Sequence, residues 1–193
     1  MTEQLQAKPW LRHVPNALTV LRLILVPIFL VFLFAHPDLW EWRLASALAF
    51  SVAIATDFAD GRIARKYDLV SDFGKLWDPI ADKALTGAAF VALSILDELP
   101  WWVTIIILVR EWGITWMRVV MLKYGVMAAA AGGKVKTFLQ SIALILYLLN
   151  IDSVFMMWLG YLTMGAAFVL TVVTGLLYIR DALRLRAAQQ ADA

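Results

Sequence analysis

The sequence predicts an all-α membrane protein with six transmembrane helices and both termini in the cytoplasm. Three observations carry this prediction. Hydrophobic residues make up 62% of the 193-residue chain, whereas soluble domains are nearer half apolar. The apolar residues fall into six segments, and the mean hydropathy is +0.76. Lys and Arg gather in alternate connections between these segments, which is the pattern expected of the connections that face the cytoplasm.

A helix needs about 20 mostly apolar residues to cross the hydrocarbon core of a bilayer. By this criterion the predicted spans are 16–35, 43–64, 79–97, 100–122, 135–150 and 153–179. No small-residue cleavage site follows the first span, so we expect a retained helix rather than a signal peptide. Pro27 lies inside this span and is expected to kink it, which neighbouring helices can accommodate.

The connections between the spans indicate the orientation. The connections 65–78 and 123–134 are the longer ones, and the basic residues fall in or beside them and near both termini. The connections HPDLWEW, DELPWW and NIDS are short and mostly acidic. The positive-inside rule then places the segment 1–13 and the tail 181–193 in the cytoplasm. We expect one membrane domain over 1–193, in the cell (inner) membrane, with no cysteine-based site and no nucleic-acid partner.

Four aspartates lie at the predicted cytoplasmic ends of the second and third spans. Carboxylates at membrane depth are costly and usually functional. Residues at i, i+3, i+4, i+7 and i+8 share a helix face, and this spacing relates Asp57, Asp60, Gly61, Ala64 and Arg65. Asp78 and Asp82 are likewise four residues apart. Asp78 precedes Pro79, which predicts a helix N-cap followed by proline at the first helical position.

Four clustered carboxylates repel one another unless cations neutralise them. Ligands that are all oxygen favour Mg²⁺ or Mn²⁺ over zinc or copper. Gly61 and Ala64 leave space for a bulky ligand, and Arg65 can contact a phosphate. The combination predicts two divalent ions that bind a pyrophosphate for phosphoryl transfer.

A structural interpretation stands beside this one. Asp78 alone is typical of a helix cap. Asp57 can form a structural ion pair with Arg65 or Lys83, and Gly61 with Ala64 is also typical of close helix packing.

The run D57-x2-D60-G61-x2-A64-R65-x8-G74-x3-D78-x3-D82 resembles the signature of the CDP-alcohol phosphatidyltransferases at all eight defined positions. Less specific resemblances extend over most of the chain: VPNALTVLRLILVPIF at the start, VREW at 109–112 and GKVKTFLQ at 133–140. They are most similar to the members that use glycerol 3-phosphate as acceptor. The resemblance implies a six-helix membrane enzyme, commonly a homodimer, with its active site on the cytoplasmic side.

The resemblance also implies the reaction and the roles of the residues. A phosphatidyl group passes from CDP-diacylglycerol, embedded in membrane lipid, to glycerol 3-phosphate, and CMP is released. Asp57, Asp60 and Asp78 would bind two Mg²⁺ or Mn²⁺ ions, and Asp82 would be both a metal ligand and the general base. The CDP-lipid site would comprise Asn16, Thr19, Gly61, Ala64, Arg65, Ser71 and Gly74.

Basic residues on the fourth and fifth spans suggest an acceptor site. Arg110 and Arg118 are eight residues apart on one predicted helix, and Lys134 and Lys136 begin the next. Unpaired arginines are costly within a membrane, so an anion should meet them. In the functional interpretation, this anion is the phosphate of glycerol 3-phosphate, bound by guanidinium groups. In the structural interpretation, it is Glu111, or Asp57 and its neighbours.

Other functions compete with this one. Within the family, the acceptor could be the lipid from which cardiolipin is made, or another alcohol such as inositol phosphate. Outside the family, intramembrane carboxylates are also typical of small cation or proton transporters. A transporter would place its acids near the membrane midplane on discontinuous helices. The aspartates here lie at one membrane face beside Arg65, which favours an enzyme.

Overall fold

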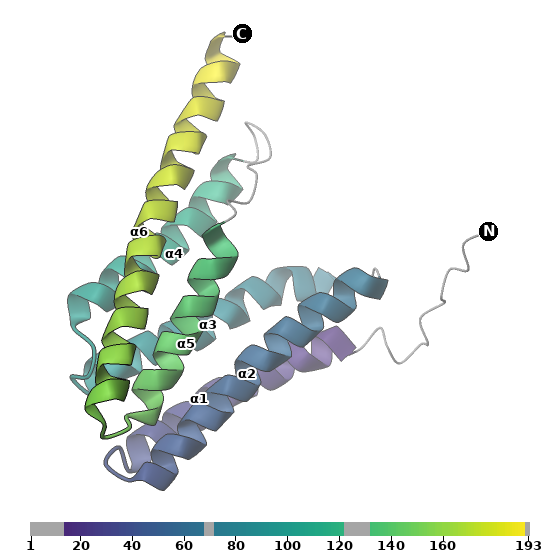
Figure 1. Ribbon diagram of the computed structural model, residues 1–193. Coiled ribbons are helices and arrows are strands. Elements are labelled where there is room, and N and C mark those ends of the chain that lie inside the picture. Colours follow the sequence, from purple (N-terminus) through teal and green to yellow (C-terminus); the bar gives the residue numbers. More distant parts are fainter. Residues whose placement is uncertain (1–13, 68–71, 122–131, 192–193) are drawn as a thin grey trace. The chain divides into compact units, whose positions relative to one another are not determined.

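The computed structural model describes the backbone of residues 14–67, 72–121 and 132–191. Side chains are described over 16–58, 80–121, 133 and 135–187. Within these residues all the regular secondary structure is α-helix, joined by short turns (Figure 1). The helices are α1 (Val14–Ala35), α2 (Trp40–Tyr67), α3 (Asp72–Ile95), α4 (Trp101–Met121), α5 (Gly132–Leu149) and α6 (Val154–Ala191). The prediction of a six-helix, all-α protein is confirmed.

The helices divide between two compact units. One comprises residues 1–92 and 148–150, and the other residues 93–147 and 151–193. In the first unit, α1 and α2 pack side by side along a helical hairpin. Phe29 and Phe50 are fully buried there, and their rings meet edge to face with centroids 5.6 Å apart. The Ser46 hydroxyl donates to the Phe29 carbonyl over 3.1 Å, so a polar side chain in this interface is satisfied by backbone.

The second unit contains α4, α6 and most of α5. Helices α4 and α6 pack together, and Trp102 of α4 meets Phe168 of α6 edge to face with ring centroids 5.4 Å apart. A hydrogen bond of 2.7 Å joins the buried hydroxyls of Ser94 and Thr104, and so ties the end of α3 to α4. Gly160 of α6 lies against Tyr147 of α5, whose ring is 3.5 Å from the position that a Cβ would occupy.

The short connections end helices by local backbone chemistry. Asp97 follows α3 with φ of 57°, and Asn150 follows α5 with φ of 44°. Asp and Asn are among the few residues that adopt this left-handed conformation readily, and it commonly terminates helices. The amides of Glu98 and Leu99 both donate to the Leu93 carbonyl, which closes the turn. DELPWW and NIDS therefore form the tight turns that their residues predict.

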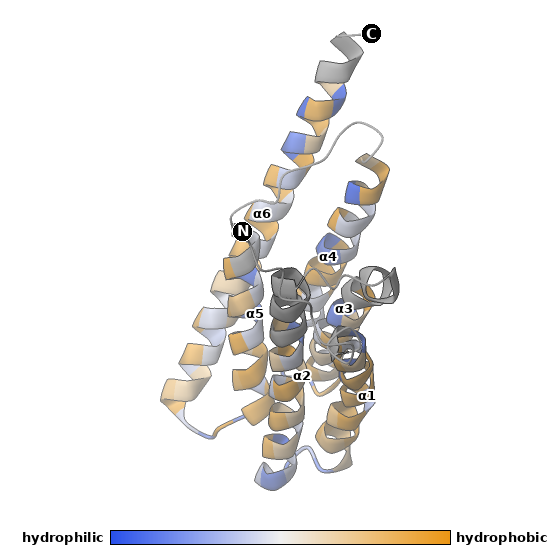
Figure 2. Ribbon diagram, turned by 90° about the vertical axis from the view of Figure 1, so that its right-hand side faces the viewer, coloured by the Kyte–Doolittle hydropathy of each residue, from blue (hydrophilic) through white to orange (hydrophobic). Residues whose placement is uncertain are grey.

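Over the part of the chain whose side chains are described, two helices are long and apolar enough to cross a bilayer: α1 over Asn16–Ala35 and α6 over Val154–Ala187. Figure 2 shows the apolar character of α1 and the polar residues near the C-terminal end of α6. Large apolar side chains remain at the surface, and Val109, Trp116 and Leu162 are 66%, 73% and 66% exposed. Apolar exposure on this scale fits a lipid environment better than water.

The start of α3 differs from the prediction. The helix begins at Asp72, so Asp78 and Pro79 lie inside it, and the predicted N-cap at Asp78 is wrong. The predicted loop 65–78 is also wrong in most of its length, because α2 continues to Tyr67 and α3 begins at Asp72. Proline removes one backbone hydrogen bond and crowds the preceding turn. Here helical structure continues through Pro79, as it does through Pro27 of α1.

We predict that Phe50→Ala lowers the stability of the protein in detergent by about 3 kcal/mol, because truncating a buried phenylalanine leaves a cavity. The midpoint of unfolding, followed by tryptophan fluorescence, measures the effect. Phe34→Ala on α1 is the matched control, since Phe34 is 40% exposed. Equal losses in the two variants would contradict the assignment of the Phe29–Phe50 contact to the core.

Candidate active site

The aspartates of the motif lie on two helices. Helix α2 carries Asp57 and Asp60, and α3 carries Asp78 and Asp82. The other motif positions follow the same division: Gly61, Ala64 and Arg65 lie on α2, and Gly74 lies on α3. Side chains are described for Asp57 and Asp82, which are both half-buried. Those of Asp60, Arg65 and Asp78 fall outside the described residues, as does Ser71.

Asp57 forms an ion pair with a residue of α1. The Arg22 Nη1 lies 2.8 Å from the Asp57 Oδ1, and the Arg22 side chain has no exposed surface, whereas that of Asp57 is 44% exposed. The predicted structural partners of Asp57 were Arg65 or Lys83. The contact with Arg22 was not predicted, and the Arg65 side chain lies outside the described residues. A guanidinium buried this completely requires an anion. The pair therefore joins α1 to the motif helix and fixes one oxygen of Asp57.

The predicted CDP-lipid residues of α1 precede Arg22 on that helix, and Thr19 is its neighbour one turn away. Thr19 is fully buried and Asn16 is half-buried. Asn16, Thr19 and Arg22 are spaced by three residues, which places them on adjoining positions of one helix face. A cation inside a predicted span is the signal by which Arg22 could have been identified from the sequence.

The donor atoms of the motif suit a hard divalent ion. Among the side chains that the structure describes, no group of three or more His, Asp or Glu lies close enough to hold a metal. Asp57 and Asp82 are the motif members within that set. Carboxylate oxygens are the ligands that Mg²⁺ and Mn²⁺ prefer, so the residue types fit the predicted ions.

A second charged cluster lies within the other unit. Glu111 of α4 accepts hydrogen bonds at a single oxygen, Oε1, from two cations. One is Arg110 of the same helix, whose Nη1 lies 3.0 Å away, and the other is the Nζ of Lys136 on α5. The side chains of Arg110, Lys136 and Glu111 are 12%, 6% and 19% exposed, respectively. One carboxylate therefore neutralises part of the charge of two nearly buried cations.

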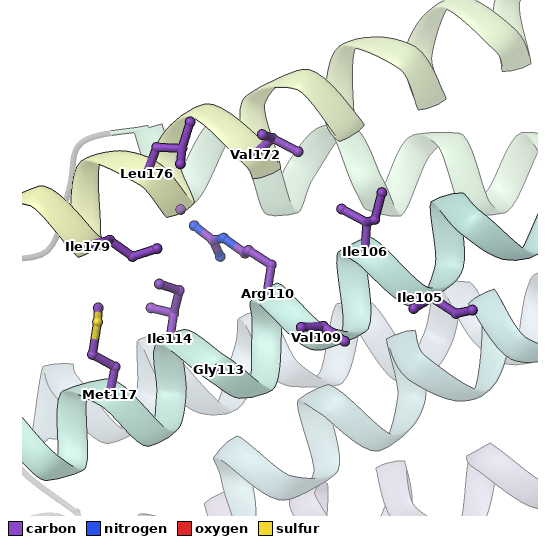
Figure 3. Close-up of a pocket in the computed structure, with 11 residues that line it drawn as sticks. Ile105, Ile106, Val109, Arg110, Gly113, Ile114, Met117, Val172, Leu176 and Ile179 are labelled. Carbon is purple, nitrogen blue, oxygen red and sulfur yellow. The ribbon is translucent and has the colours of Figure 1, made fainter.

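Arg110 also reaches α6 (Figure 3). Its Nη2 donates to the Thr174 hydroxyl over 2.7 Å. At Gly175, a Cβ would lie 3.1 Å from the Arg110 Cγ and 3.2 Å from its Nε, so the absence of a side chain there gives the arginine room to cross. The guanidinium borders a groove of about 560 Å³ between α4 and α6, whose other lining residues are apolar.

Arg118 lies farther along α4 and contacts the end of Tyr178. Its Nη2 donates to the Tyr178 hydroxyl over 2.6 Å. Its guanidinium carbon is 4.7 Å from the centre of the ring, and that of Arg110 is 5.9 Å from the same centre. Tyr178 is buried, whereas Arg118 is exposed. Both arginines of α4 are therefore oriented by one aromatic residue of α6.

These contacts show which neighbours three of the four predicted acceptor-site residues have. Arg110 and Lys136 come together at Glu111, which was the structural partner considered for the basic residues. The Lys134 side chain lies outside the described residues. Tyr178 and Thr174 were not identified from the sequence, and no local pattern marks them. Their positions 60 and 64 residues from their arginine partners can be found only in three dimensions.

Comparison with known proteins identifies relatives over most of the chain. The family model for CDP-alcohol phosphatidyltransferase matches residues 12–177. A probable phosphatidylglycerophosphate synthase of Mycobacterium tuberculosis is 41% identical over 186 residues, which cover 95% of this chain and 88% of the relative. The CDP-diacylglycerol–glycerol-3-phosphate 3-phosphatidyltransferase of Bacillus subtilis is 39% identical over 152 residues, covering 72% and 77%.

A protein of Rickettsia felis with the same name as the Bacillus enzyme is 36% identical over 177 residues, which cover 88% of this chain and 94% of the relative. The family match includes both helices of the aspartate motif and the cluster of cations on α4 and α5. The chain belongs to the CDP-alcohol phosphatidyltransferase family.

Proposed function

We propose that this protein transfers the phosphatidyl group of CDP-diacylglycerol to sn-glycerol 3-phosphate, giving phosphatidylglycerophosphate and CMP. The observation that carries the proposal is the extended similarity to relatives named for this reaction, at 36–41% identity over most of the chain. The cations of α4 and α5 support the choice of a phosphorylated acceptor, because guanidinium and ammonium groups bind phosphate oxygens well.

The transfer exchanges one phosphorus–oxygen bond for another. The primary hydroxyl of glycerol 3-phosphate attacks the phosphorus that carries diacylglycerol, and the bond from this phosphorus to the bridging oxygen of the pyrophosphate breaks. CMP departs with that oxygen. Asp82 is the proposed general base, which takes the proton from the attacking hydroxyl. Its half-buried position on α3 leaves the carboxylate accessible to a bound substrate.

The proposed metal ligands are Asp57, Asp60, Asp78 and Asp82. Two Mg²⁺ or Mn²⁺ ions held there would offset the negative charge of the pyrophosphate and of the departing CMP. Arg22 has a supporting role in this proposal, because its ion pair fixes the Asp57 carboxylate from the α1 side. The CDP-lipid would contact the remaining motif positions and the α1 residues: Asn16, Thr19, Gly61, Ala64, Arg65, Ser71 and Gly74.

The proposed acceptor site comprises Arg110, Arg118, Lys134 and Lys136. Lys136 carries a charge that is almost buried, and Arg118 is exposed at the end of a fixed aromatic ring. Arg110 is held by Glu111 and Thr174. An acceptor without a phosphate offers these cations nothing to bind, so the site should discriminate strongly against free glycerol.

The proposal also covers the membrane location, the topology and the oligomeric state of the enzyme. The protein would be a multi-pass protein of the cell (inner) membrane, with the aspartates on the cytoplasmic side and both termini in the cytoplasm, and would act as a homodimer. The distribution of Lys and Arg supports this orientation, and the apolar α1 and α6 support insertion in a bilayer.

We predict that the purified protein releases CMP from CDP-diacylglycerol when glycerol 3-phosphate is supplied. Free glycerol should support a rate at least about a hundredfold lower, since a site built to bind a polar group rejects analogues that lack it, by factors of about 10⁴ in favourable cases. Inositol phosphate and phosphatidylglycerol carry a phosphate but differ from glycerol 3-phosphate in shape, and each should also be used more slowly. Equal use of free glycerol would refute the assignment of the acceptor, and preference for phosphatidylglycerol would indicate cardiolipin synthesis.

We predict that Asp57→Asn, Asp60→Asn and Asp78→Asn each abolish turnover, and that a chelator abolishes the activity of the unmodified protein until Mg²⁺ or Mn²⁺ is restored. Asp82→Asn should lower the rate by about 10² or more, the scale of general-base contributions. CMP release is the measurement. Asp38→Asn is the control, since Asp38 is exposed beyond the end of α1. Full activity in chelator would disprove the metal site.

We predict that Lys136→Ala and Arg118→Ala raise the KM for glycerol 3-phosphate by about tenfold or more, as expected when a charge-assisted contact of about 1.5–3 kcal/mol is lost. The KM for CDP-diacylglycerol should change little. Tyr178→Phe removes the hydroxyl that orients Arg118 and should give a smaller change in the same direction. Arg180→Ala, at an exposed ion pair of α6, is the control. Changes confined to the KM of the lipid substrate would show that these residues serve another site.

A further inference from the structure

Glu111 is the charged residue of the α4–α5 cluster to which the reaction as proposed assigns no role. Its Oε1 accepts from the Arg110 Nη1 at 3.0 Å and from the Lys136 Nζ. Because both cations use the same oxygen, the geometry brings a guanidinium of α4 and an ammonium of α5 to one point. Glu111 lies next to Arg110 in VREW, the sequence motif at 109–112.

Electrostatics makes this carboxylate necessary for the arrangement. Arg110, Lys136 and Glu111 together carry a formal charge of +1, and their side chains are at most 19% exposed. Two cations at such close range and in a low-dielectric setting repel strongly. Without the carboxylate they would separate, since the Lys136 ammonium moves on a flexible four-carbon stem.

Arg110 has further contacts, which it makes with α6. Arg110 is fixed a second time by α6, through the Thr174 hydroxyl and through its close contact with Gly175. The Arg110 Nε is buried and has no hydrogen-bond partner among the residues that the structure describes. The position of the Arg110 guanidinium is therefore set by α4 and α6, and the contacts of both cations with Glu111 link Lys136 of α5 to it.

We propose that Glu111 is a positioning residue of the acceptor site, which holds Arg110 and Lys136 side by side so that both can face the acceptor phosphate. This inference rests on the proposed function and adds the residue that orients its cations. The opposite role for Glu111 would be inhibitory: its carboxylate would compete with the acceptor phosphate for the donors of Arg110 and Lys136. The two roles predict opposite changes in acceptor affinity when the charge of Glu111 is removed.

The test compares Glu111→Gln, which keeps the shape but loses the charge, with Glu111→Asp, which keeps the charge on a shorter side chain. Positioning predicts that Glu111→Gln raises the KM for glycerol 3-phosphate by about thirtyfold or more, the lower end of what losing one partner of a buried charge pair costs. The KM for CDP-diacylglycerol should stay within about twofold, and Glu111→Asp should give an intermediate value for the acceptor. Asp181→Asn, which removes the carboxylate of an exposed pair on α6, is the control and should change neither constant.

A second comparison tests whether Glu111 acts through Lys136. In the Lys136→Ala background, Glu111→Gln should add much less than it does alone, because coupled residues are not additive. The thermal unfolding of each variant is measured in detergent to check that the variant folds. If Glu111→Gln does not fold, Glu111→Asp decides, and an unchanged KM for glycerol 3-phosphate in that variant overturns the proposal.

Several outcomes would overturn the positioning role. A lower KM for glycerol 3-phosphate in Glu111→Gln would show competition instead. Equal increases in Glu111→Gln and Glu111→Asp, or equal increases for both substrates with reduced stability, would show a role in packing. If Lys136→Ala leaves the KM for glycerol 3-phosphate unchanged, the acceptor site itself is wrong. If Lys136→Ala raises it and Glu111→Gln does not, only the role of Glu111 fails.

Discussion

The pairing of charges between helices is the constraint on which this structure depends. An ionised side chain among apolar helices costs several kcal/mol unless an opposite charge meets it. Each unit contains such a charge pair: Arg22 with Asp57 between α1 and α2, and Lys136 with Glu111 between α5 and α4. Each pair restricts how its two helices can rotate against one another. The charges that the proposed chemistry requires therefore also specify the packing.

Neutral polar side chains add weaker links of the same kind. Gln140 of α5 donates to the Thr171 hydroxyl of α6 over 3.0 Å, and the Thr171 hydroxyl donates to the backbone of its own helix. Interhelical hydrogen bonds in membrane proteins contribute about 0.6 kcal/mol on average. Links of this size select a register between helices rather than supply most of the stability. The aromatic contacts, such as Trp102 with Phe168, contribute the close packing around them.

The aspartate at the first position of the motif shows how structural and chemical roles coincide. Asp57 pairs with a fully buried arginine and still presents a side chain that is 44% exposed. A structural ion pair and a metal ligand were alternative interpretations of this residue, but a carboxylate has two oxygens and several lone pairs. One oxygen meets Arg22 in the structure. The pair thus positions a carboxylate that the proposed function uses as a metal ligand.

The sequence alone determined the helical class, the six apolar segments, the short turns and the membership of the family, because these depend on local hydrophobicity, turn residues and fixed spacing along one helix. It also identified the cations of α4 and α5. It also offered Glu111 as a partner for these cations, and the structure shows Glu111 with Arg110 and Lys136. Only the tertiary structure revealed Arg22 as a partner of Asp57 and Tyr178 as a partner of Arg118. Periodicity states which residues share a face of one helix, but not which neighbouring helix that face meets or how the two are rotated. The start of α3 at Asp72 has a similar origin, since local rules favour a helix end at Asp78–Pro79 and yet the helix extends beyond it. Partner identity is a property of packing between distant segments, and for that reason it was beyond the reach of the sequence patterns.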